Sequence, residues 1–382
     1  MKNFSLPGLQ LAFLMIFCLG CKEVFEPEVS RLDHNLLVVE GYIEVGGGET
    51  SISLGRTEPV YGSVSLSPVL WAAVNIESES GSSWLLSHQG DGTYTLADHL
   101  PENQNYRLRI ETEAQEYLSE WIMPIITPET PEITFEKREG DVTIYANTLG
   151  DENARYFLWQ FEETWAYRSP YRAYYRYAPN TNQMVLLKEE EQTYKCWQSN
   201  ISTRIILASS EQYQNDYIYQ KELLKIENRS EKLGERYSVL VRQKAIDQKA
   251  FVFWEAIRKN SDDIGGIFSP LPSLISSNLY NVDDPEEPVI GYLSAGKSVE
   301  KRIYINKKEV EPWKTVIPDY SRCQIDTVSA KDYPTVFWGG FYTPLYSECI
   351  LDVCPEFFAT TSDCADCTAR GGFLQKPEFW ED

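Results

Sequence analysis

The sequence predicts a mainly β protein with two β-sandwich domains, one short helix in the second domain and a disulfide-rich C-terminal tail. Three observations support this fold class. Residues 36–126 hold about seven short apolar segments separated by turn residues, without helical periodicity. Aromatic residues make up 13% of the 382 residues, with 24 Tyr among them, and they favour half-buried strands. Six cysteines gather beyond residue 190.

The first domain is expected over residues 36–126. Its strand candidates are 36–45, 51–54, 69–76, 84–86, 94–96, 106–110 and 117–122. Within one of them, Tyr106, Leu108 and Ile110 alternate with two arginines, which puts the apolar side chains on one face of a strand. About seven short strands over such a length favour an immunoglobulin- or fibronectin-like sandwich. A Pro-rich stretch over 124–131 then resembles a linker.

The second domain is expected over residues 127–318. Its β region begins at Ile133, with strand candidates 142–145, 156–161, 202–208, 237–241, 289–294 and 301–305, and the last two are expected to close its sheet. The acidic turn 283–287 lacks the spacing and the glycine of a calcium loop. We interpret it as a solvated turn, with calcium binding as the alternative.

One helix is expected, over residues 247–260. Asp247 can cap its N-terminus, because a carboxylate there accepts hydrogen bonds from the first free amides. Ala250, Phe253, Trp254 and Ile257 recur at three- and four-residue spacing and form one apolar stripe. The stripe is expected to pack on the second sheet.

Residues 165–177 contain more aromatic rings than one strand can bury. The segment is expected to form a projecting hairpin or loop whose rings contact a partner, since arginine and tyrosine together hold sugars and carboxylates. The alternative is that it folds back onto its own domain. The candidate partner-binding residues are Trp165, Tyr167, Tyr171, Arg172, Tyr174, Tyr175, Arg176 and Tyr177.

Cysteines organise the tail, residues 319–382. An even number of cysteines in an exported chain implies disulfides. The tail has little hydrophobic periodicity, so disulfides are expected to be its main source of order. The alternatives are a zinc site formed by the last four cysteines, or redox chemistry at the final pair. The disulfide candidates are Cys196, Cys323, Cys349, Cys354, Cys364 and Cys367.

Residues 1–20 have the features of a secretion signal that ends at a lipid-acceptor cysteine. Lys2 precedes an apolar run over 6–19, shorter than the roughly 18 residues of a membrane-spanning helix. Gly20 directly before Cys21 is typical of bacterial lipoproteins, although Cys18 stands where leucine is usual. Acyl chains on Cys21 would anchor the chain to the lipid membrane, since each buried methylene contributes about 0.8 kcal/mol. Ordinary secretion is the alternative.

Charge and motif content exclude several functions. The formal net charge is −22, which disfavours nucleic acid, because phosphate contacts need clustered cations. Residues 21–35 are expected to form an acidic tether. The three histidines lack a nucleophile elbow or a zinc-binding motif around them, and no dinucleotide fingerprint is present. A glycosidase carboxylate pair leaves no readable motif, but we expect no enzyme, no cofactor and no metal.

Landmarks along the chain resemble one protein family. They include Leu37-Val38-Val39-Glu40-Gly41-Tyr42-Ile43, Cys196-Trp197, Tyr237-Ser238-Val239-Leu240-Val241, Phe253-Trp254, Gly265-Gly266-Ile267-Phe268, Val289-Ile290-Gly291-Tyr292, and the ending Cys364-x2-Cys367-x3-Gly371-Gly372 with Phe379-Trp380. In this order they resemble the Bacteroidota lipoprotein family called domain of unknown function 4249. The resemblance implies an outer-membrane lipoprotein, often encoded beside a TonB-dependent receptor, and it implies no catalytic residues.

The expected function is therefore that of a non-enzymatic outer-membrane lipoprotein. It would act as an accessory or ligand-capturing partner of a TonB-dependent barrel, with a glycan or a peptide as a possible ligand. Acidic residues behind Cys21 resemble those of surface-exported lipoproteins, which favours a position facing the cell exterior. The alternatives are a surface protein that binds or processes glycans, and an adhesin.

Overall fold

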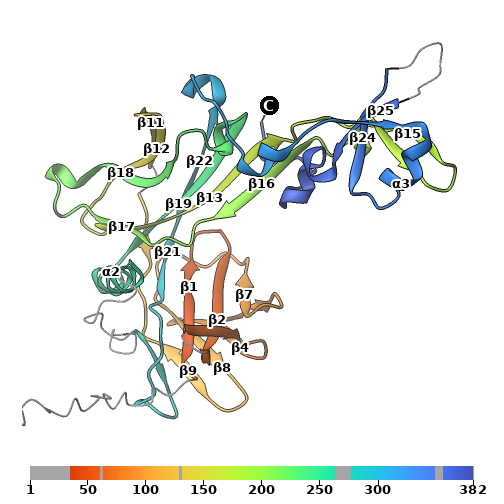
Figure 1. The fold of residues 1–382 in the computed structure, drawn as a ribbon. Coiled ribbons are helices and arrows are strands. Elements are labelled where there is room, and N and C mark those ends of the chain that lie inside the picture. Colours follow the sequence, from red (N-terminus) through yellow and green to blue (C-terminus); the bar gives the residue numbers. More distant parts are fainter. Residues whose placement is uncertain (1–34, 61–62, 129–130, 263–276, 349–355, 382) are drawn as a thin grey trace, which may run out of the picture.

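Three β lobes make up the molecule, and Figure 1 shows two of them one above the other with the third projecting to one side. This computed structural model describes residues 35–60, 63–128, 131–262, 277–348 and 356–381. The expected mainly β fold class is confirmed, with two β sandwiches, helices in the second half of the chain and disulfides near the C-terminus.

The first lobe is a sandwich of a seven-stranded and a five-stranded sheet. The larger sheet has the order β10-β21-β1-β2-β7-β6, and β3 pairs with β2. Its strands are β1 (Leu37–Glu44), β2 (Thr50–Val60), β3 (Ser63–Pro68), β6 (Ser87–His88), β7 (Thr93–Leu96), β10 (Ile125–Ile126) and β21 (Ser294–Lys297). The smaller sheet has the order β20-β9-β8-β4-β5. Its strands are β4 (Ala73–Ser78), β5 (Ser83–Leu85), β8 (Tyr106–Glu111), β9 (Glu116–Ser119) and β20 (Leu279–Asn281).

Alternation of side chains along β8 builds the core of this sandwich. Tyr106, Leu108 and Ile110 are fully buried between the sheets, as the sequence pattern predicts. Arg107 and Arg109 point to the other face, where the Nε of each lies 2.7 Å from a carboxylate oxygen of Glu77. The strand therefore buries its apolar face and keeps its cations paired at the surface.

The second lobe is a sandwich of a three-stranded and a five-stranded sheet. The smaller sheet consists of β11 (Glu132–Arg138), β12 (Asp141–Leu149) and β18 (Tyr217–Ile226). The larger sheet consists of β16 (Lys195–Ile201), β13 (Tyr156–Arg168), β19 (Arg236–Ile246), β22 (Val299–Asn306) and β17 (Ile206–Ser209), which pairs with β13. A hydrogen-bond group is buried between the sheets: Gln243 Oε1 accepts hydrogen bonds from Trp159 Nε1 and Thr148 Oγ1, each at 2.8 Å.

Helix α2 (Gln248–Asp262) confirms the expected helix. Asp247 Oδ1 accepts a hydrogen bond from the Ala250 amide at 2.9 Å, so it caps the N-terminus. Ala250 and Phe253 are buried against Leu158 and other residues on the outer face of the larger second sheet, as the stripe predicts. The same cluster includes Tyr42 and Tyr292 from the first lobe, so the helix packs against both sandwiches.

The chain returns from the second lobe to the first with β20, which pairs with β9, and residues 289–297 of this returning segment then run beside β1. The Val39 amide donates to Ile290 O at 2.8 Å and the Ile290 amide donates to Leu37 O at 2.9 Å. β21 then adds to β1 in parallel before the chain re-enters the second lobe as β22. The expectation that 289–294 closes the second sheet is wrong, because a buried apolar run fits the sheet of either sandwich equally well. The expectation that 301–305 pairs in the second sheet is confirmed.

The stretch over 124–131 is not a free linker where the structure describes it. β10 pairs with β21. Thr127 is fully buried, and its Oγ1 accepts a hydrogen bond from the Ala245 amide of β19 at 2.9 Å. The Thr127 amide in turn donates to Lys297 O at 3.1 Å. These contacts fix the junction between the two sandwiches.

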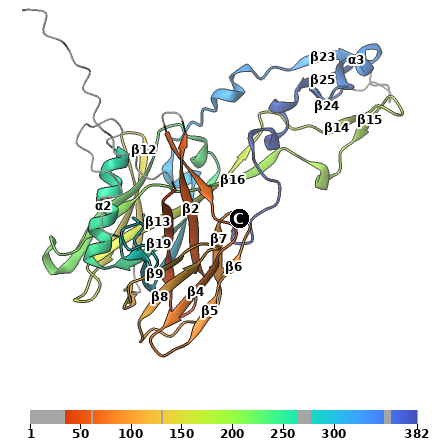
Figure 2. The ribbon, with the colours of Figure 1, turned by 90° about the horizontal axis from the view of Figure 1, so that it is seen from below.

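The third lobe joins the aromatic segment to the tail, and Figure 2 shows it extending away from both sandwiches. It contains the hairpin of β14 (Tyr175–Ala178) and β15 (Gln183–Leu186), the sheet β23-β25-β24 and helix α3 (Tyr333–Phe337). The sheet strands are β23 (Asp326–Ser329), β24 (Tyr342–Tyr346) and β25 (Glu356–Thr361). Val328, Tyr333, Phe337, Phe357 and Ala359 form its buried core. The tail therefore has an apolar core in addition to its disulfides, which its weak hydrophobic periodicity did not predict.

Substitution of Gly291 tests the returning segment. Gly291 has a φ of +145°, and a Cβ there would lie 2.1 Å from Val39 O. Gly291→Ala should lower the free energy of unfolding by roughly 2 kcal/mol or more, because backbone strain adds to a clash with a strand. Urea unfolding measures the change. Gly339→Ala is the matched control, since no atom lies within 4 Å of its added Cβ. Equal midpoints for the two variants would contradict the prediction.

Candidate functional site

We call the third lobe the arm; among the described residues it comprises 169–194, 318–348 and 356–370. It contains most of the residues that the sequence marks as partner-binding or disulfide-forming. Its first half leaves the second sandwich at the end of β13, and the hairpin β14–β15 extends it outward. Its second half is the tail, which packs along the hairpin.

Trp165 and Tyr167 belong to the core of the second sandwich and not to a partner surface. Their side chains are 5% and 3% exposed. Both lie on β13, which pairs with β16 on one side and with β19 on the other. The expectation that these two residues contact a partner is wrong, because β13 runs on to Arg168 as a central strand.

The next three candidates lie at the root of the arm. Tyr171 is half-buried, and its hydroxyl donates to Cys323 O at 3.3 Å. Arg172 Nη2 lies 2.9 Å from a carboxylate oxygen of Glu189. The Tyr174 side chain is exposed and lies beneath the Arg172 guanidinium, with 5.4 Å between that group and the ring centroid. Tyr174 thus stays a candidate for partner contact.

The last three candidates lie on the hairpin. The ring centroids of Tyr175 and Phe357 are 5.0 Å apart in an edge-on contact, and those of Tyr177 and Phe337 are 6.0 Å apart. Arg176 faces Glu191 at 3.5 Å. The hairpin does project from its sandwich, but the faces of Tyr175 and Tyr177 that were expected to meet a partner cover the tail of the same chain.

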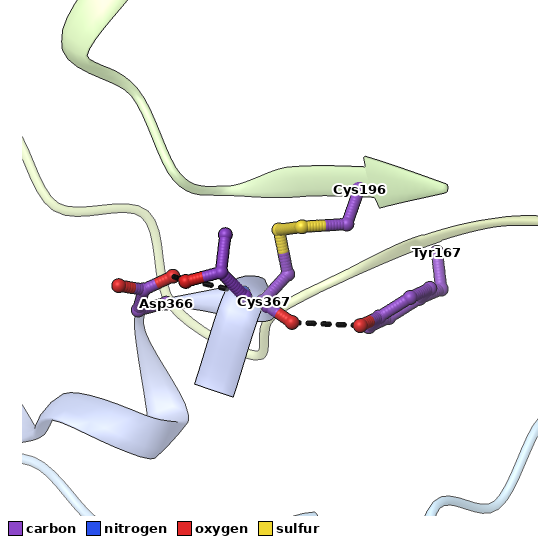
Figure 3. The surroundings of a disulfide bond; sticks show 5 residues. Tyr167, Cys196, Asp366 and Cys367 are labelled. Carbon is purple, nitrogen blue, oxygen red and sulfur yellow. Dashed lines mark hydrogen bonds between the residues drawn. A yellow bond between two sulfur atoms is a disulfide. The ribbon is translucent and has the colours of Figure 1, made fainter. Parts of the chain in front are cut away.

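Two disulfides fasten the tail to the rest of the molecule. Cys196 on β16 is bonded to Cys367, which ties the tail to the second sandwich (Figure 3). Cys323 is bonded to Cys364 within the arm. These pairings exclude Cys364 and Cys367 as zinc ligands and as a redox pair with each other. Cys349 and Cys354 lie outside the described residues, as does Cys21.

A hydrogen bond and an ion-pair cluster accompany the first disulfide. Tyr167 Oη donates to Cys367 O at 2.7 Å, as Figure 3 shows. Burial raises the pKa of Tyr167 to about 12, so the phenol remains a donor over the physiological range. Arg370 forms two hydrogen bonds with Glu231, the shorter 2.7 Å, and one of 3.0 Å with Asp319. The base of the arm is thus fixed by covalent and ionic contacts.

The most exposed aromatic side chains of the arm are ones that the sequence analysis missed. Trp338 and Phe341 are 67% and 70% exposed, and they flank two glycines between α3 and β24. We call residues 338–341 the arm tip. Tyr333 and Phe337 are buried on one face of α3, which leaves Trp338 pointing outward. A Trp-Gly-Gly-Phe run directly after a short amphipathic helix is the signal that could have revealed them.

Comparison with known proteins places the chain in a family. A family model described as a domain of unknown function, DUF4249, matches residues 22–302. The chain belongs to the DUF4249 family. The family predicted from the sequence is thereby confirmed, and the matched range of this DUF4249 protein includes the hairpin, α2 and most strands of both sandwiches.

Two further comparisons were made with the DUF4249 chain. A two-domain fibronectin type-III segment of chicken tenascin is similar at 12% sequence identity and a TM-score of 0.16, with 54% of this chain and 89% of that chain covered. No curated protein matches the chain. In the part of the chain that the structure describes, none of the helices is long and apolar enough to cross a membrane.

Removal of the first disulfide should loosen the arm. In the double variant Cys196→Ser with Cys367→Ser, the contact between tail and sandwich loses about 2–4 kcal/mol, because the open chain gains conformational freedom. Limited proteolysis measures this as faster cleavage within residues 318–370. The Cys323→Ser and Cys364→Ser pair is the control, since it leaves the link to β16 intact. Equal cleavage rates in the first variant and the wild type would contradict the prediction.

Proposed function

We propose that this protein is a non-enzymatic outer-membrane lipoprotein that acts as an accessory or ligand-capturing partner of a TonB-dependent barrel. Acylated Cys21 would hold it in the membrane, and the acidic residues behind Cys21 favour a position facing the cell exterior. The family resemblance drawn from the sequence motivates the choice of a barrel as partner.

The arm tip is the single observation that carries the proposal. Trp338 and Phe341 expose most of their side chains at the end of a lobe that is braced by a disulfide at its base. Rigid aromatic anchors are the residue types that dominate binding energy in protein interfaces. A preorganised lobe also loses little conformational freedom on binding. The arm thus suits contact with a partner protein better than catalysis.

The remaining surface offers a comparison for the arm tip. Trp71 on the first sandwich is 82% exposed, but it follows β3 in a loop outside the arm. Isolated apolar residues on a surface are normal, whereas two large rings within four residues form a small patch. The proposal therefore assigns partner contact to the tip and none to Trp71.

A pull-down from native membranes tests the partner. The double variant Trp338→Ser with Phe341→Ser should recover at least about tenfold less barrel than the wild type, because hot-spot side chains contribute 2 kcal/mol or more each. Trp71→Ser is the matched control and should recover as much barrel as the wild type. Recovery of the wild-type protein without any barrel, or equal loss in both variants, would overturn the proposal.

A separate experiment tests the anchor. Cys21→Ser should abolish the mass of the attached acyl chains and move the protein from the detergent phase to the aqueous phase, because no lipid remains to bury. Intact-mass measurement and phase partitioning record both changes. The Cys323→Ser and Cys364→Ser pair, which removes a disulfide elsewhere, is the control and should keep the acyl mass and the detergent partitioning. Unchanged mass and partitioning of Cys21→Ser would contradict the anchor.

A further inference from the structure

A cleft of about 390 Å³ lies between the two sandwiches. One wall is the outer face of the larger second sheet, from β13 and β19. The other wall is formed by β1 and β2 of the first sandwich, and residues 201–205 with Trp254 of α2 complete the lining. Small-molecule sites often lie at such domain interfaces, with volumes of roughly 300–1,000 Å³.

Lys244 lines the cleft and carries a charge that its surroundings compensate only in part. Along β19, Val241, Gln243 and Ala245 face the sandwich core, so Lys244 projects from the opposite face into the cleft. Its Nζ donates one hydrogen bond, to Gln160 Oε1 at 3.0 Å, and lies 4.8 Å from the ring centroid of Tyr42. Among the described residues no carboxylate lies within ion-pair distance of this ammonium, which has three donors.

The buried carboxylate of Glu163 is fully hydrogen-bonded, in contrast to the Lys244 ammonium. Glu163, 2% exposed, accepts hydrogen bonds from Lys232 at 2.7 and 2.8 Å, from Tyr237 at 2.8 Å and from Asn200 at 3.2 Å. Buried charges are normally paired in this way, because an unpaired one is costly. Lys244 therefore retains donors that an anionic ligand could use.

The charged groups around Lys244 are of both signs. Burial, and next the Arg242 guanidinium, lower the pKa of Lys244 to about 8, while Glu44, Glu40 and Glu300 act in the opposite direction. Arg242 is itself occupied, since its Nε donates to Glu300 at 2.6 Å. Lys244 is thus mostly charged at neutral pH, in surroundings that disfavour the charge. A carboxylate beside it would relieve that cost.

The rest of the lining restricts the ligand. Leu158, Ile205, Ile246 and Trp254 supply apolar and aromatic surface, and Ser51 and Ser53 supply hydroxyl groups. Glu40 and Glu162 also line the cleft, and their carboxylates repel a ligand that carries several negative charges. The lining therefore fits a single anionic group attached to an apolar body.

We propose that this cleft binds a small organic monocarboxylate with an apolar or aromatic body, held by Lys244 at its carboxylate and by Trp254 and Leu158 along its body. The inference goes beyond the proposed function, because the cleft lies away from the arm and requires no barrel. Its test uses the purified protein alone, so its failure would leave the barrel proposal untouched, and the reverse also holds.

Two probes of the same shape separate charge from apolar contact. Calorimetric titration of the full-length protein in non-ionic detergent compares 1-naphthylacetate with the neutral 1-naphthylacetamide, and micelles alone are the blank. The acid should bind about tenfold or more tightly than the amide, because a charged hydrogen bond adds to the same apolar burial. Equal affinities, or no saturable binding of the acid at millimolar concentration, would overturn the proposal.

Variants locate the site. Lys244→Met should reduce the affinity for 1-naphthylacetate to that for the amide, whereas Lys188→Met, a surface lysine on the arm 74% exposed, should leave it unchanged. Ser51→Trp fills the cleft from the opposite wall and should abolish binding of both probes, which keeps the test valid if Lys244→Met fails to fold. Thermal unfolding of each variant monitors its fold. Wild-type discrimination between acid and amide in a folded Lys244→Met or Ser51→Trp protein would overturn the assignment.

The pH dependence gives an independent measurement. The Lys244 ammonium is protonated below about pH 8 and loses its charge above it. Affinity for 1-naphthylacetate should therefore be constant between pH 6 and 7, and it should fall as the pH rises above about 8, while affinity for the amide stays flat. The other charged groups around the Lys244 ammonium are Glu40, Glu44, Glu300 and Arg242, and Glu162 and Arg204 also line the cleft. A flat profile for the acid would count against Lys244 as its anchor.

Discussion

Hydrogen bonds between the returning segment and β1 hold the two sandwiches in one arrangement. Ile290 bridges Leu37 and Val39, and β21 continues the same pairing before the chain leaves for the second sheet. Because β21 and β22 follow each other directly, one stretch of chain belongs to both sandwiches. The buried Thr127 closes the junction on the other side. The cleft depends on this constraint, since its two walls come from different sandwiches.

The arm depends on a different kind of constraint. The hairpin β14–β15 is too small to be stable alone, and it packs on the three-stranded sheet and helix α3 of the tail. Together they enclose Tyr333, Phe337 and Phe357, with Tyr175 and Tyr177 packed against them. The Cys196–Cys367 disulfide and the Arg370 ion pairs then attach this shared lobe to the second sandwich. Aromatic rings from two distant parts of the sequence thus form one shared core, and the rings of the arm tip remain outside that core.

The ion pairing of the cations follows from the strongly acidic composition of the chain. With a formal net charge of −22, carboxylates are abundant, and most cations in the described structure meet one at close range. Lys244 forms no ion pair in the described structure, and Arg242 beside it already binds Glu300. Composition sets the overall field of the molecule, while the position of a strand residue decides which carboxylates its side chain can reach.

The sequence by itself determined the longer strands of the first sandwich within residues 36–122, helix α2 with its Asp247 cap, the family and the use of disulfides. These features follow from local periodicity, from a cap next to its helix, or from residue types that persist along the chain. Only the tertiary structure decided that 289–297 joins the first sandwich, that Trp165 and Tyr167 are core residues, and which cysteines pair. Each of these depends on contacts between residues far apart in sequence. The pattern of an alternating or apolar segment does not specify which sheet the segment joins.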